Sequence, residues 1–263
     1  MTDDDFRSRL LAAYDDQMRG FSTGPDTVQD HDGTLMRLTG GRRGFVSTPR
    51  DVGVRGDALD ALITRQAAHF AAHGQAFVWR TRGHDRPADL PDRLLAAGFV
   101  PGPRETVIAG LAADLDLDAA PPAGVTVRRT ADPADLPRIA AMETAVWGQD
   151  MGFLADHLLG LLTARPDEVA VLVAEADREV VSAAWLMLDR GREFAGLRGG
   201  STLAAWRGRG VYRALVAQRA RIALENGHRY LHVDATDDSS PILQRLGLTA
   251  ITTTTPYLWT PPT

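Results

Sequence analysis

Hydrophobic and polar positions in the second half of the chain follow the order typical of an α/β fold. A short β-branched run at 125–129 predicts a strand. Asp132-Pro133 then provides an N-cap with proline at the first helical position, and amphipathic spacing predicts a helix through about Val146. The same spacing predicts a second helix from about Phe153 to Thr163.

Three strands are expected after these helices. Apolar runs at 169–174 and 180–188 have the length of buried strands, and Asp177-Arg178 between them predicts a turn. A third run at 194–204 contains Gly199-Gly200. Because glycine inside a strand indicates a bulge or a close backbone approach, we expect an irregularity there.

The last part of the chain predicts a helix between two strands, then a short helix and a final strand. Residues 207–213, Arg-Gly-Arg-Gly-Val-Tyr-Arg, open a helix that a glycine ends. Residues 230–235 predict a strand. Ser240-Pro241 starts a short helix, and 248–259 predicts a terminal strand broken at Pro256.

A segment rich in Asp, Ala, Pro and Gly divides the chain into halves of similar size. Neither strand nor helix periodicity continues through Pro121-Pro122. We therefore expect a first domain over 1–111, a linker over 112–123 and a second domain over 124–263.

The two halves share a weak internal repeat. A shift of 153 positions places 60–63 on 213–216, Gly74 on Gly227, and 77–78 on 230–231. The identities are few, but helix, glycine, strand, short helix and glycine follow in the same order. We infer that the first half is a diverged copy of the second.

Composition excludes several kinds of site. All 29 basic residues are Arg, there is no Cys, and 34 acidic residues give a net charge of −5. Without Lys, a Schiff-base lysine and the Lys-dependent phosphate loop are excluded. Without Cys, thiol nucleophiles, disulfides and thiolate-bound metals are excluded. The net charge also argues against an extended nucleic-acid-binding face.

The loop at 207–213 has the features of an anion site. Gly208 and Gly210 allow a tight turn and a close approach to a ligand, while the first amides of the following helix point outward. Arg207, Arg209 and Arg213 add positive charge. These features suit a pyrophosphate, and the alternative is a surface glycine turn with solvated arginines.

This loop resembles motif A of the GCN5-related N-acetyltransferases (GNAT), which reads Arg or Gln, two residues, Gly, one residue, then Gly or Ala. Arg207 and Gly210 match, and Tyr212 replaces the final small residue. The resemblance covers about 124–259 and includes Arg-Leu-Gly-Leu at 245–248, similar to the family's Lys-Leu-Gly-Phe. It implies an α/β fold of two GNAT-like halves, each a mixed twisted sheet flanked by helices.

The resemblance also implies acetyl-CoA, or another acyl-CoA, as the donor substrate. The donor would lie where the sheet splays between its fourth and fifth strands. The backbone near Leu203 would hold the pantetheine and the thioester carbonyl, and helix amides would hold the pyrophosphate. The expected donor-binding loop consists of Arg207, Gly208, Arg209, Gly210, Val211, Tyr212 and Arg213.

Two departures from the family pattern concern catalysis. Many members place a Tyr, the acid for the leaving thiolate, where Leu243 stands. A base carboxylate often lies late on the fourth strand, but Arg198 and Gly199 occupy that region. Asp234 is a weak candidate base acting through water, because strand alternation places it on one face with His232. Its alternative is an ordinary strand-end carboxylate.

The first half lacks the donor-binding features. The repeat places Asp57 where Gly210 stands and Val54 where Arg207 stands. Negative charge is unfavourable where a pyrophosphate would rest. We therefore expect the first half not to bind CoA in this way, and to serve structure or shape the substrate cleft.

Two other groups of residues are weaker candidates. His69 and His73 have the i, i+4 spacing of a helical metal pair, but no third ligand follows, so we expect no metal. Trp147, Asp150 and Met151 lie where the family forms its acceptor pocket, and the alternative is a packed turn between helices.

The sequence predicts a cytoplasmic N-acyltransferase that moves an acetyl or other acyl group from acyl-CoA to an amine by direct attack. A small-molecule acceptor is favoured over a protein. Neither a nucleic acid nor a membrane is expected as a partner, since the net charge is −5 and the longest apolar run, 180–188, is half the length of a membrane span. The N-terminus lacks a signal-peptide pattern, which favours the cytoplasm. The alternative is a non-catalytic acyl-CoA-binding or scaffold protein. Within the enzyme class, a tandem acyltransferase of small-thiol biosynthesis is a third reading. The acceptor, acyl chain and oligomeric state stay open.

Overall fold

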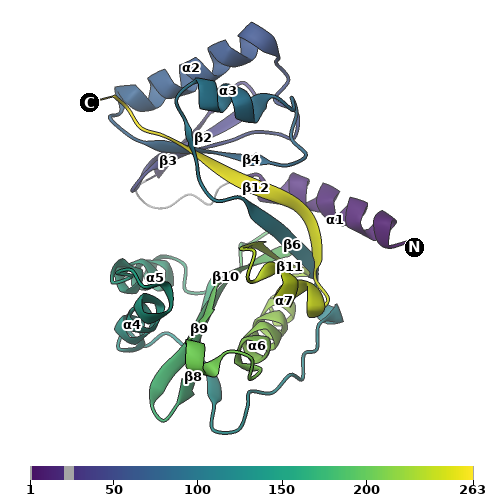
Figure 1. Cartoon of the computed structure of the whole chain (residues 1–263), viewed down its shortest axis with the longest axis vertical. Helices are drawn as coiled ribbons and strands as arrows, with labels where there is room; N and C mark the ends of the chain where they lie inside the picture. Colours follow the sequence, from purple (N-terminus) through teal and green to yellow (C-terminus); the bar gives the residue numbers. More distant parts are fainter. Residues whose placement is uncertain (1, 21–26, 263) are drawn as a thin grey trace. The chain divides into compact units, whose positions relative to one another are not determined.

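The chain folds into two compact units. The structure is a computed structural model that describes residues 2–20 and 27–262 (Figure 1). Unit 1 comprises Met1–Ile108, Asp234–Pro241 and Ala250–Thr263, and unit 2 comprises Ala109–Val233 and Ile242–Thr249. The C-terminal strand therefore belongs to the unit built mainly from the N-terminal half.

Unit 2 contains a mixed sheet in the order β11-β10-β9-β8-β7. Its strands are β7 (Thr126–Thr130), β8 (Val169–Ala176), β9 (Glu179–Met187), β10 (Phe194–Thr202) and β11 (Tyr230–Ala235). The first four pair antiparallel, while β10 and β11 pair parallel. Asp177 and Arg178 form the predicted turn between β8 and β9, both with positive φ.

Helices cover both faces of this sheet. The helices α4 (Asp135–Trp147) and α5 (Phe153–Ala164) lie on one side, and α6 (Val211–Glu225) lies on the other (Figure 1). The short helices are η1 (Ala112–Asp114), η2 (Ala204–Trp206) and α7 (Ser240–Arg245). The apolar faces of α4 and α5 pack on alternate side chains of β8, among them Val169, Val171 and Val173, which are fully buried.

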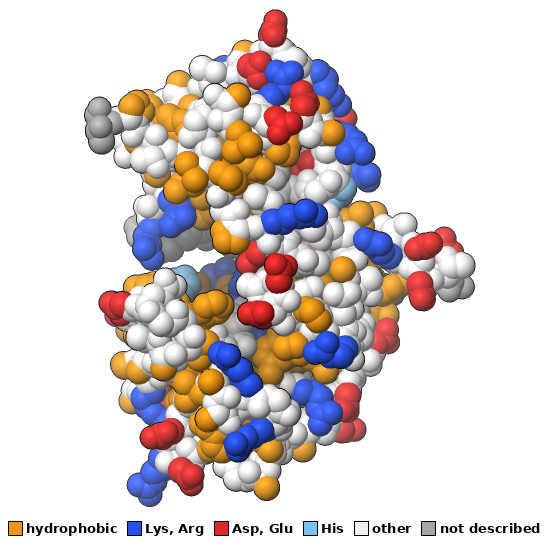
Figure 2. Space-filling view, in the orientation of Figure 1, with side chains coloured by type: hydrophobic (Ala, Val, Ile, Leu, Met, Phe, Trp, Pro, Cys, Tyr) orange, Lys and Arg blue, Asp and Glu red, His pale blue; other side chains and the backbone are white. Residues whose placement is uncertain are grey.

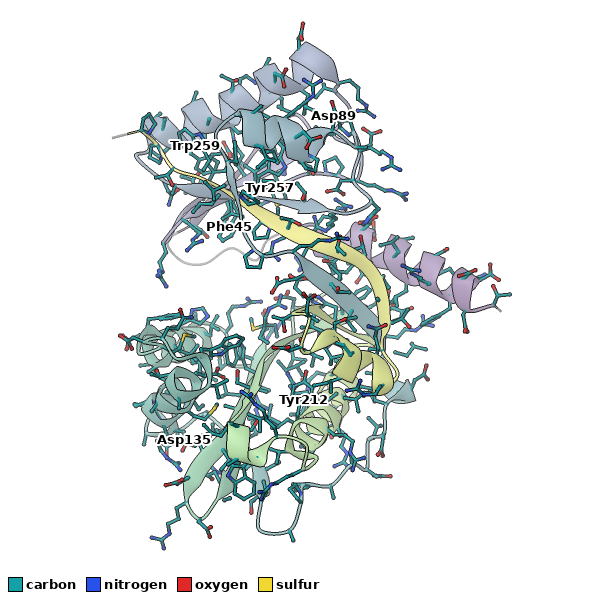
Figure 3. The ribbon with its side chains drawn as sticks, viewed as in Figure 1. Phe45, Asp89, Asp135, Tyr212, Tyr257 and Trp259 are labelled. Atoms are coloured by element: carbon teal, nitrogen blue, oxygen red, sulfur yellow. The ribbon has the colours of Figure 1, made fainter. Side chains whose placement is uncertain are left out.

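An ion-pair network ties the start of α4 to the edge of the sheet. Asp135, labelled in Figure 3, accepts hydrogen bonds from Arg128 at 2.7 Å, Arg138 at 2.7 Å and Thr130 at 2.5 Å. The Arg128 guanidinium is the largest cause that holds the pKa of Asp135 well below its usual range. Glu175 on β8 pairs with the same two arginines.

Unit 1 also contains strands of a mixed sheet flanked by helices, and one of these strands comes from the C-terminus of the chain. Its strands are β1 (Thr27–Asp32), β2 (Leu35–Gly40), β3 (Gly44–Ser47), β4 (Phe77–Arg82), β5 (Val100–Pro101), β6 (Glu105–Leu111) and β12 (Thr249–Trp259). The order runs β1-β2-β3-β4-β12-β6, with β5 also paired to β12. Its helices are α1 (Asp3–Met18), α2 (Gly56–Ala72) and α3 (Leu90–Ala96).

The core of unit 1 is aromatic. Phe70 of α2 stacks on Phe77 of β4 with ring centroids 4.2 Å apart, and Trp79 is fully buried beside them. Tyr257 of β12 joins this cluster and Trp259 packs against it (Figure 3). Because those two residues come from the C-terminus, the hydrophobic core of unit 1 is complete only with β12 in place.

The internal repeat is visible in the elements themselves. Shifted by 153 positions, β11 becomes 77–82, which is the span of β4, and α6 becomes 58–72, within one turn of the span of α2. In both units this helix connects two parallel strands, β3 to β4 and β10 to β11. The first half therefore has the local topology of the second, as the repeat predicted.

Two expectations about the chain differ from the structure. The terminal strand is not broken at Pro256, since β12 runs unbroken from Thr249 to Trp259. In a strand the N–H and C=O of one residue point to the same side, and the Pro256 carbonyl accepts from the Gly102 amide. The missing N–H of Pro256 therefore faces away from β4 and removes no bond from that ladder.

The segment expected as a linker, 112–123, lies within unit 2. It begins with the 3₁₀ turn η1, whose Ala112 amide donates to the Arg229 carbonyl at 3.0 Å. Ala112 and Leu115 are buried, and Asp118 pairs with Arg221 of α6 at 3.3 Å. Composition alone does not predict the contacts of Ala112 and Asp118, because their partners, Arg229 and Arg221, lie about a hundred positions away.

Candidate functional site

The loop between β10 and α6 has the backbone of an anion site. Gly208 and Gly210 adopt positive φ angles of 71° and 90°, a region that favours glycine. Gly210 is the N-cap of α6, and no side chain caps the first turn. The amides of Val211, Tyr212 and Arg213 therefore face outward with the positive end of the helix dipole.

The three arginines of this loop have different surroundings. Arg207 is exposed, and its Nε donates to the Thr202 carbonyl at 3.0 Å, which fastens the loop to the end of β10. The guanidinium of Arg209 lies over the Trp206 ring, with Cζ 5.1 Å from the centroid. Arg213 is exposed on the first turn of α6. Arg209 and Arg213 can therefore reach an anion without breaking an ion pair.

The predicted irregularity in β10 is a β-bulge. Gly199 pairs with Ala184 and Ser201 with Ala183, so Gly200 is the inserted residue. Gly199 and Gly200 have positive φ angles of 63° and 93°. A Cβ on Gly200 would lie 2.8 Å from a ring carbon of Tyr212, so the bulge and α6 approach too closely for any other residue.

The sheet opens between β10 and β11 beyond the first three residue pairs. The parallel ladder joins Phe194 to Tyr230 and ends at Gly196 and His232. Strand β10 continues for six further residues to Thr202 without a partner in β11. The edge of β10 that has no partner in β11 therefore leads from the end of the ladder, through the bulge, toward the glycine loop.

Leu203, expected to contact the thioester, is already hydrogen-bonded within unit 2. Its amide donates to the Val181 carbonyl at 3.0 Å, and its carbonyl accepts from Trp206 at 2.8 Å. Its side chain packs against the core cluster under α4 and α5. An oxyanion donor taken from this amide would break a sheet bond, so the bulge residues are better placed for that role.

Tyr212 fills the space that a small residue occupies in the family pattern. Its ring, labelled in Figure 3, lies against the bulge and 5.9 Å from the guanidinium carbon of Arg219. Arg219 is 1% exposed and donates to the carbonyls of Leu215 and Arg198. Burial lowers the pKa of this guanidinium from its usual value. A cation therefore lies beneath the bulge, held by carbonyls and an aromatic ring.

Glu143 on α4 is a buried carboxylate that the sequence analysis missed. Its side chain is 2% exposed, and its Oε2 accepts from Trp147 Nε1 at 2.8 Å. Burial raises the pKa of Glu143, and the hydroxyl of Ser201, the residue after the bulge, offsets part of that rise. Trp147 itself is 54% exposed, so the indole lies at the surface rather than in a packed turn.

The first candidate base, Asp234, has a structural partner. Its Oδ2 accepts from Arg80 Nη1 of unit 1 at 2.5 Å, and the Asp234 side chain is 15% exposed. Leu243, where many family members carry Tyr, is fully buried on α7. Neither position therefore presents a titratable group with the surroundings that Glu143 has.

The corresponding helix start in unit 1 carries a negative charge. Helix α2 begins at Gly56, and Asp57 lies in its first turn. His73 Nδ1 lies 2.8 Å from the carbonyl of His69, its own helix backbone, rather than facing a shared ion. Across residues 2–20 and 27–262, no group of three or more His, Asp or Glu side chains is arranged to hold a metal.

The described surface carries mixed charge on the face drawn in Figure 2. Arginines there are interspersed with acidic and hydrophobic side chains over both units. None of the helices within the described residues combines the length and apolar character needed to cross a bilayer.

Sequence comparison alone assigns no family, because no protein-family model and no curated protein matches the chain. Solved structures nevertheless share its fold. A GCN5-related N-acetyltransferase from Kribbella flavida gives a TM-score of 0.69 at 19% identity, over 98% of this chain and 96% of its own. A tandem GNAT protein from the clavulanic acid biosynthesis pathway gives 0.64 at 13% identity, over 100% and 97%.

A third solved structure supports the same conclusion. A GCN5-related N-acetyltransferase from Sphaerobacter thermophilus gives a TM-score of 0.62 at 15% identity, over 96% of this chain and 85% of its own. All three similarities extend across both units, at identities where only the fold can be compared. The chain therefore has the fold of the GCN5-related N-acetyltransferases, in the tandem arrangement that the sequence predicted.

Proposed function

We propose that the protein is an N-acyltransferase that transfers an acetyl or other acyl group from acyl-CoA to a small-molecule amine, and that unit 2 carries the reaction. The observation that carries this proposal is the loop Arg207–Arg213. It places two positive-φ glycines, an uncapped helix N-terminus and three arginines together. A turn with a purely structural role requires neither the open amides nor the surrounding charge.

The donor would lie along the free edge of β10. In this proposal the amides of Val211, Tyr212 and Arg213 bind the pyrophosphate, with Gly208 and Gly210 giving it room and Arg209 adding charge. The pantetheine would follow the part of β10 that has no partner in β11. That path brings the thioester to the bulge at Gly199 and Gly200.

The bulge is a suitable place for the carbonyl oxygen of the thioester. Attack by an amine turns this oxygen into an oxyanion, which needs positive potential that is already in position. The bulge interrupts the pairing of β10, and the Arg219 guanidinium lies just beneath it. We assign Arg219 a positioning and electrostatic role, since its guanidinium is held by the carbonyls of Leu215 and Arg198.

Glu143 is our candidate for the base. An amine nucleophile must be neutral to attack, and it loses a second proton when the tetrahedral intermediate collapses. A carboxylate whose pKa is raised by burial accepts that proton more readily than an exposed one. The C–N bond forms in the attack, and the C–S bond breaks when the intermediate collapses, so CoA leaves as a thiolate that takes a proton from water. Asp234 is less suited to this role, because it is paired with Arg80.

A panel of amines tests this function. The wild-type chain is incubated with acetyl-CoA and representative polyamines, amino sugars, amino acids and arylamines, and release of free CoA thiol is followed. We expect acceptor-dependent release with at least one class, and formation of the N-acetyl product in the same reaction. The lack of Cys in the chain keeps the thiol assay free of a protein background.

A non-catalytic acyl-CoA-binding protein is the second candidate. It is favoured by the fully buried Leu243 where many family members carry the acid for the leaving thiolate. Saturable acetyl-CoA binding without product from any amine would support this candidate. Absence of acetyl-CoA binding would exclude both.

A further inference from the structure

Unit 1 contains a cavity of about 580 Å³ that has no part in the proposed transfer. One wall is a single face of α1, formed by residues at i, i+3, i+4 and i+7 from Asp4 to Leu11. The other wall comes from the loop after β4 and from β6 and β12, including Arg104, Thr106 and Thr252. Figure 1 shows α1 beside these two strands. The volume lies in the range of small-molecule sites.

Two arginines face this cavity from opposite walls. Arg7 extends from α1 and Arg104 from the segment leading into β6, and both are exposed. Neither makes an ion pair or a hydrogen bond in the described part of the chain, whereas Arg19 and Arg82 of the same unit bind acceptors. Two guanidinium groups across a shared space attract a ligand with more than one negative charge. Asp4 adds one carboxylate to the lining, at the exposed first turn of α1.

Two of the residues that line the cavity, His84 and Thr252, belong to a polar network. The imidazole of His84 lies with Nδ1 2.7 Å from the Thr252 hydroxyl and Nε2 2.8 Å from Asp15. Asp15 also pairs with Arg19 at 2.6 Å, and Arg19 pairs with the buried Asp85. His84 Nε2 donates a hydrogen bond to the Asp15 carboxylate, and this contact fixes the ring whose Nδ1 faces the Thr252 hydroxyl. A side chain already held by hydrogen bonds loses little conformational entropy when it binds a ligand.

We propose that this cavity is a second ligand site that binds a small organic anion carrying carboxylate or phosphate groups. Arg7 and Arg104 pair with its charges, and the hydroxyls of Thr106 and Thr252 supply hydrogen bonds. The site goes beyond the proposed acyl transfer, because every residue in it belongs to unit 1. It gives the half that lacks the donor-binding loop a role of its own.

Calorimetric titration of the full-length chain tests the site with two probes, citrate for carboxylates and glucose 6-phosphate for phosphate esters. We expect saturable binding of one of them, weakened roughly tenfold or more by Arg104→Gln and by Arg7→Gln, since each removes a charge-assisted hydrogen bond. Both positions are exposed, so these variants should fold, which circular dichroism checks.

Two controls separate this site from other sources of binding. Arg43→Gln removes an exposed arginine of unit 1 outside the cavity and should leave binding unchanged. Gly210→Asp impairs the proposed donor loop and should also leave it unchanged. The proposal is overturned if neither probe binds saturably, or if Arg43→Gln weakens binding as much as Arg104→Gln does. Either result leaves the test of acyl transfer unaffected.

Discussion

Glu143 shows how one buried side chain can serve function at a cost to stability. Its carboxylate is almost completely enclosed and has no cationic partner among the interactions that set its pKa. Burial raises this pKa above that of the unfolded chain. The folded state therefore binds the proton more tightly, and folding stability falls as the pH rises from the unfolded pKa through the folded one. Once the pH is above the folded pKa, the ionised carboxylate carries the full desolvation penalty.

We predict that Glu143→Gln keeps or increases the stability at neutral pH while it slows acyl transfer. Glutamine preserves the shape and the acceptor for Trp147 but has no charge to desolvate. Loss of a general base typically costs roughly 10²- to 10⁴-fold in rate. Thermal melts at neutral and acidic pH, together with kcat/KM across pH, measure both effects.

The pH profile distinguishes a base from a structural group. Wild-type kcat/KM should rise with pH as Glu143 loses its proton, and the variant should lack that rise. Asp156→Asn, an exposed carboxylate on α5, serves as the control and should change neither quantity. An unchanged pH profile in Glu143→Gln would remove Glu143 from the mechanism.

At the scale of one residue, the sequence predicted the turn glycines but neither the burial of Glu143 nor the ion pair of Asp234. Glycines with positive φ leave a local signal, because the chain needs them where it turns. Glu143 also left a signal in the sequence. Counted from Leu136, Ile139 is at i+3, Ala140 at i+4 and Glu143 at i+7, so Glu143 lies on the apolar face of its helix. The pair between Asp234 and Arg80 left none, because the two lie 154 positions apart.

At the scale of an element, β10 does most to shape the proposed site. It pairs with β11 for only three residues, then bulges at Gly200 and ends at the glycine loop. The bulge is locked by Tyr212 on one side, while Trp185 lies against Gly199. A side chain at Gly200 would therefore face both an unfavourable φ and a close neighbour.

We predict that Gly200→Ala destabilises unit 2 by about 3 kcal/mol, the sum of left-handed strain and overpacking. The matched control is Gly191→Ala, which has a similar φ of 77° and no atom within 4 Å of the added Cβ. It should cost only about 1–2 kcal/mol. Urea unfolding of both variants measures the difference.

A double variant isolates the contact from the strain. Combining Gly200→Ala with Tyr212→Ala removes the ring that the new Cβ would meet, so the two losses should be less than additive. Strictly additive losses would show that the close approach of β10 and α6 is not what requires glycine at 200.

The elements were predictable to the extent that their patterns are local. Strand 230–235 and the turn at Asp177-Arg178 follow directly from hydrophobic runs and turn residues. Helix α4 begins at Asp135 rather than at Pro133, and Asp132, the predicted N-cap, instead accepts from the Ala134 amide in the preceding turn. The unbroken β12 could not be foreseen, since tolerance of Pro256 depends on which neighbour its missing N–H would have faced.

At the scale of the whole molecule, the repeat and the motif together predicted a tandem GNAT fold. The sequence did not show that the C-terminal strand completes the sheet of the first unit. The strand joins this sheet because β12 pairs with β4, whose residues lie more than 170 positions earlier in the chain. Local periodicity carries no information about partners at such a distance.

The two units also differ in charge at the equivalent helix start, and this difference carries the central claim. Unit 2 has Gly210 before α6, whereas unit 1 has Asp57 in the first turn of α2. A carboxylate about 6–8 Å from a phosphate charge costs about 2–3 kcal/mol at an effective dielectric constant near 20. Under the proposed function, this one carboxylate is enough to disfavour a phosphate at the helix start of unit 1.

Titration of acetyl-CoA into the full-length chain and two variants at position 210 tests this claim most directly. Gly210→Asn accepts the left-handed backbone without charge, and no atom lies closer than 3.9 Å to its Cβ. Gly210→Asp has nearly the same shape with a negative charge. We predict that Asp weakens binding roughly 30-fold relative to Asn. Equal affinities of the Asp and Asn variants, or of Gly210→Asp and the wild type, would contradict the placement of the pyrophosphate at this helix.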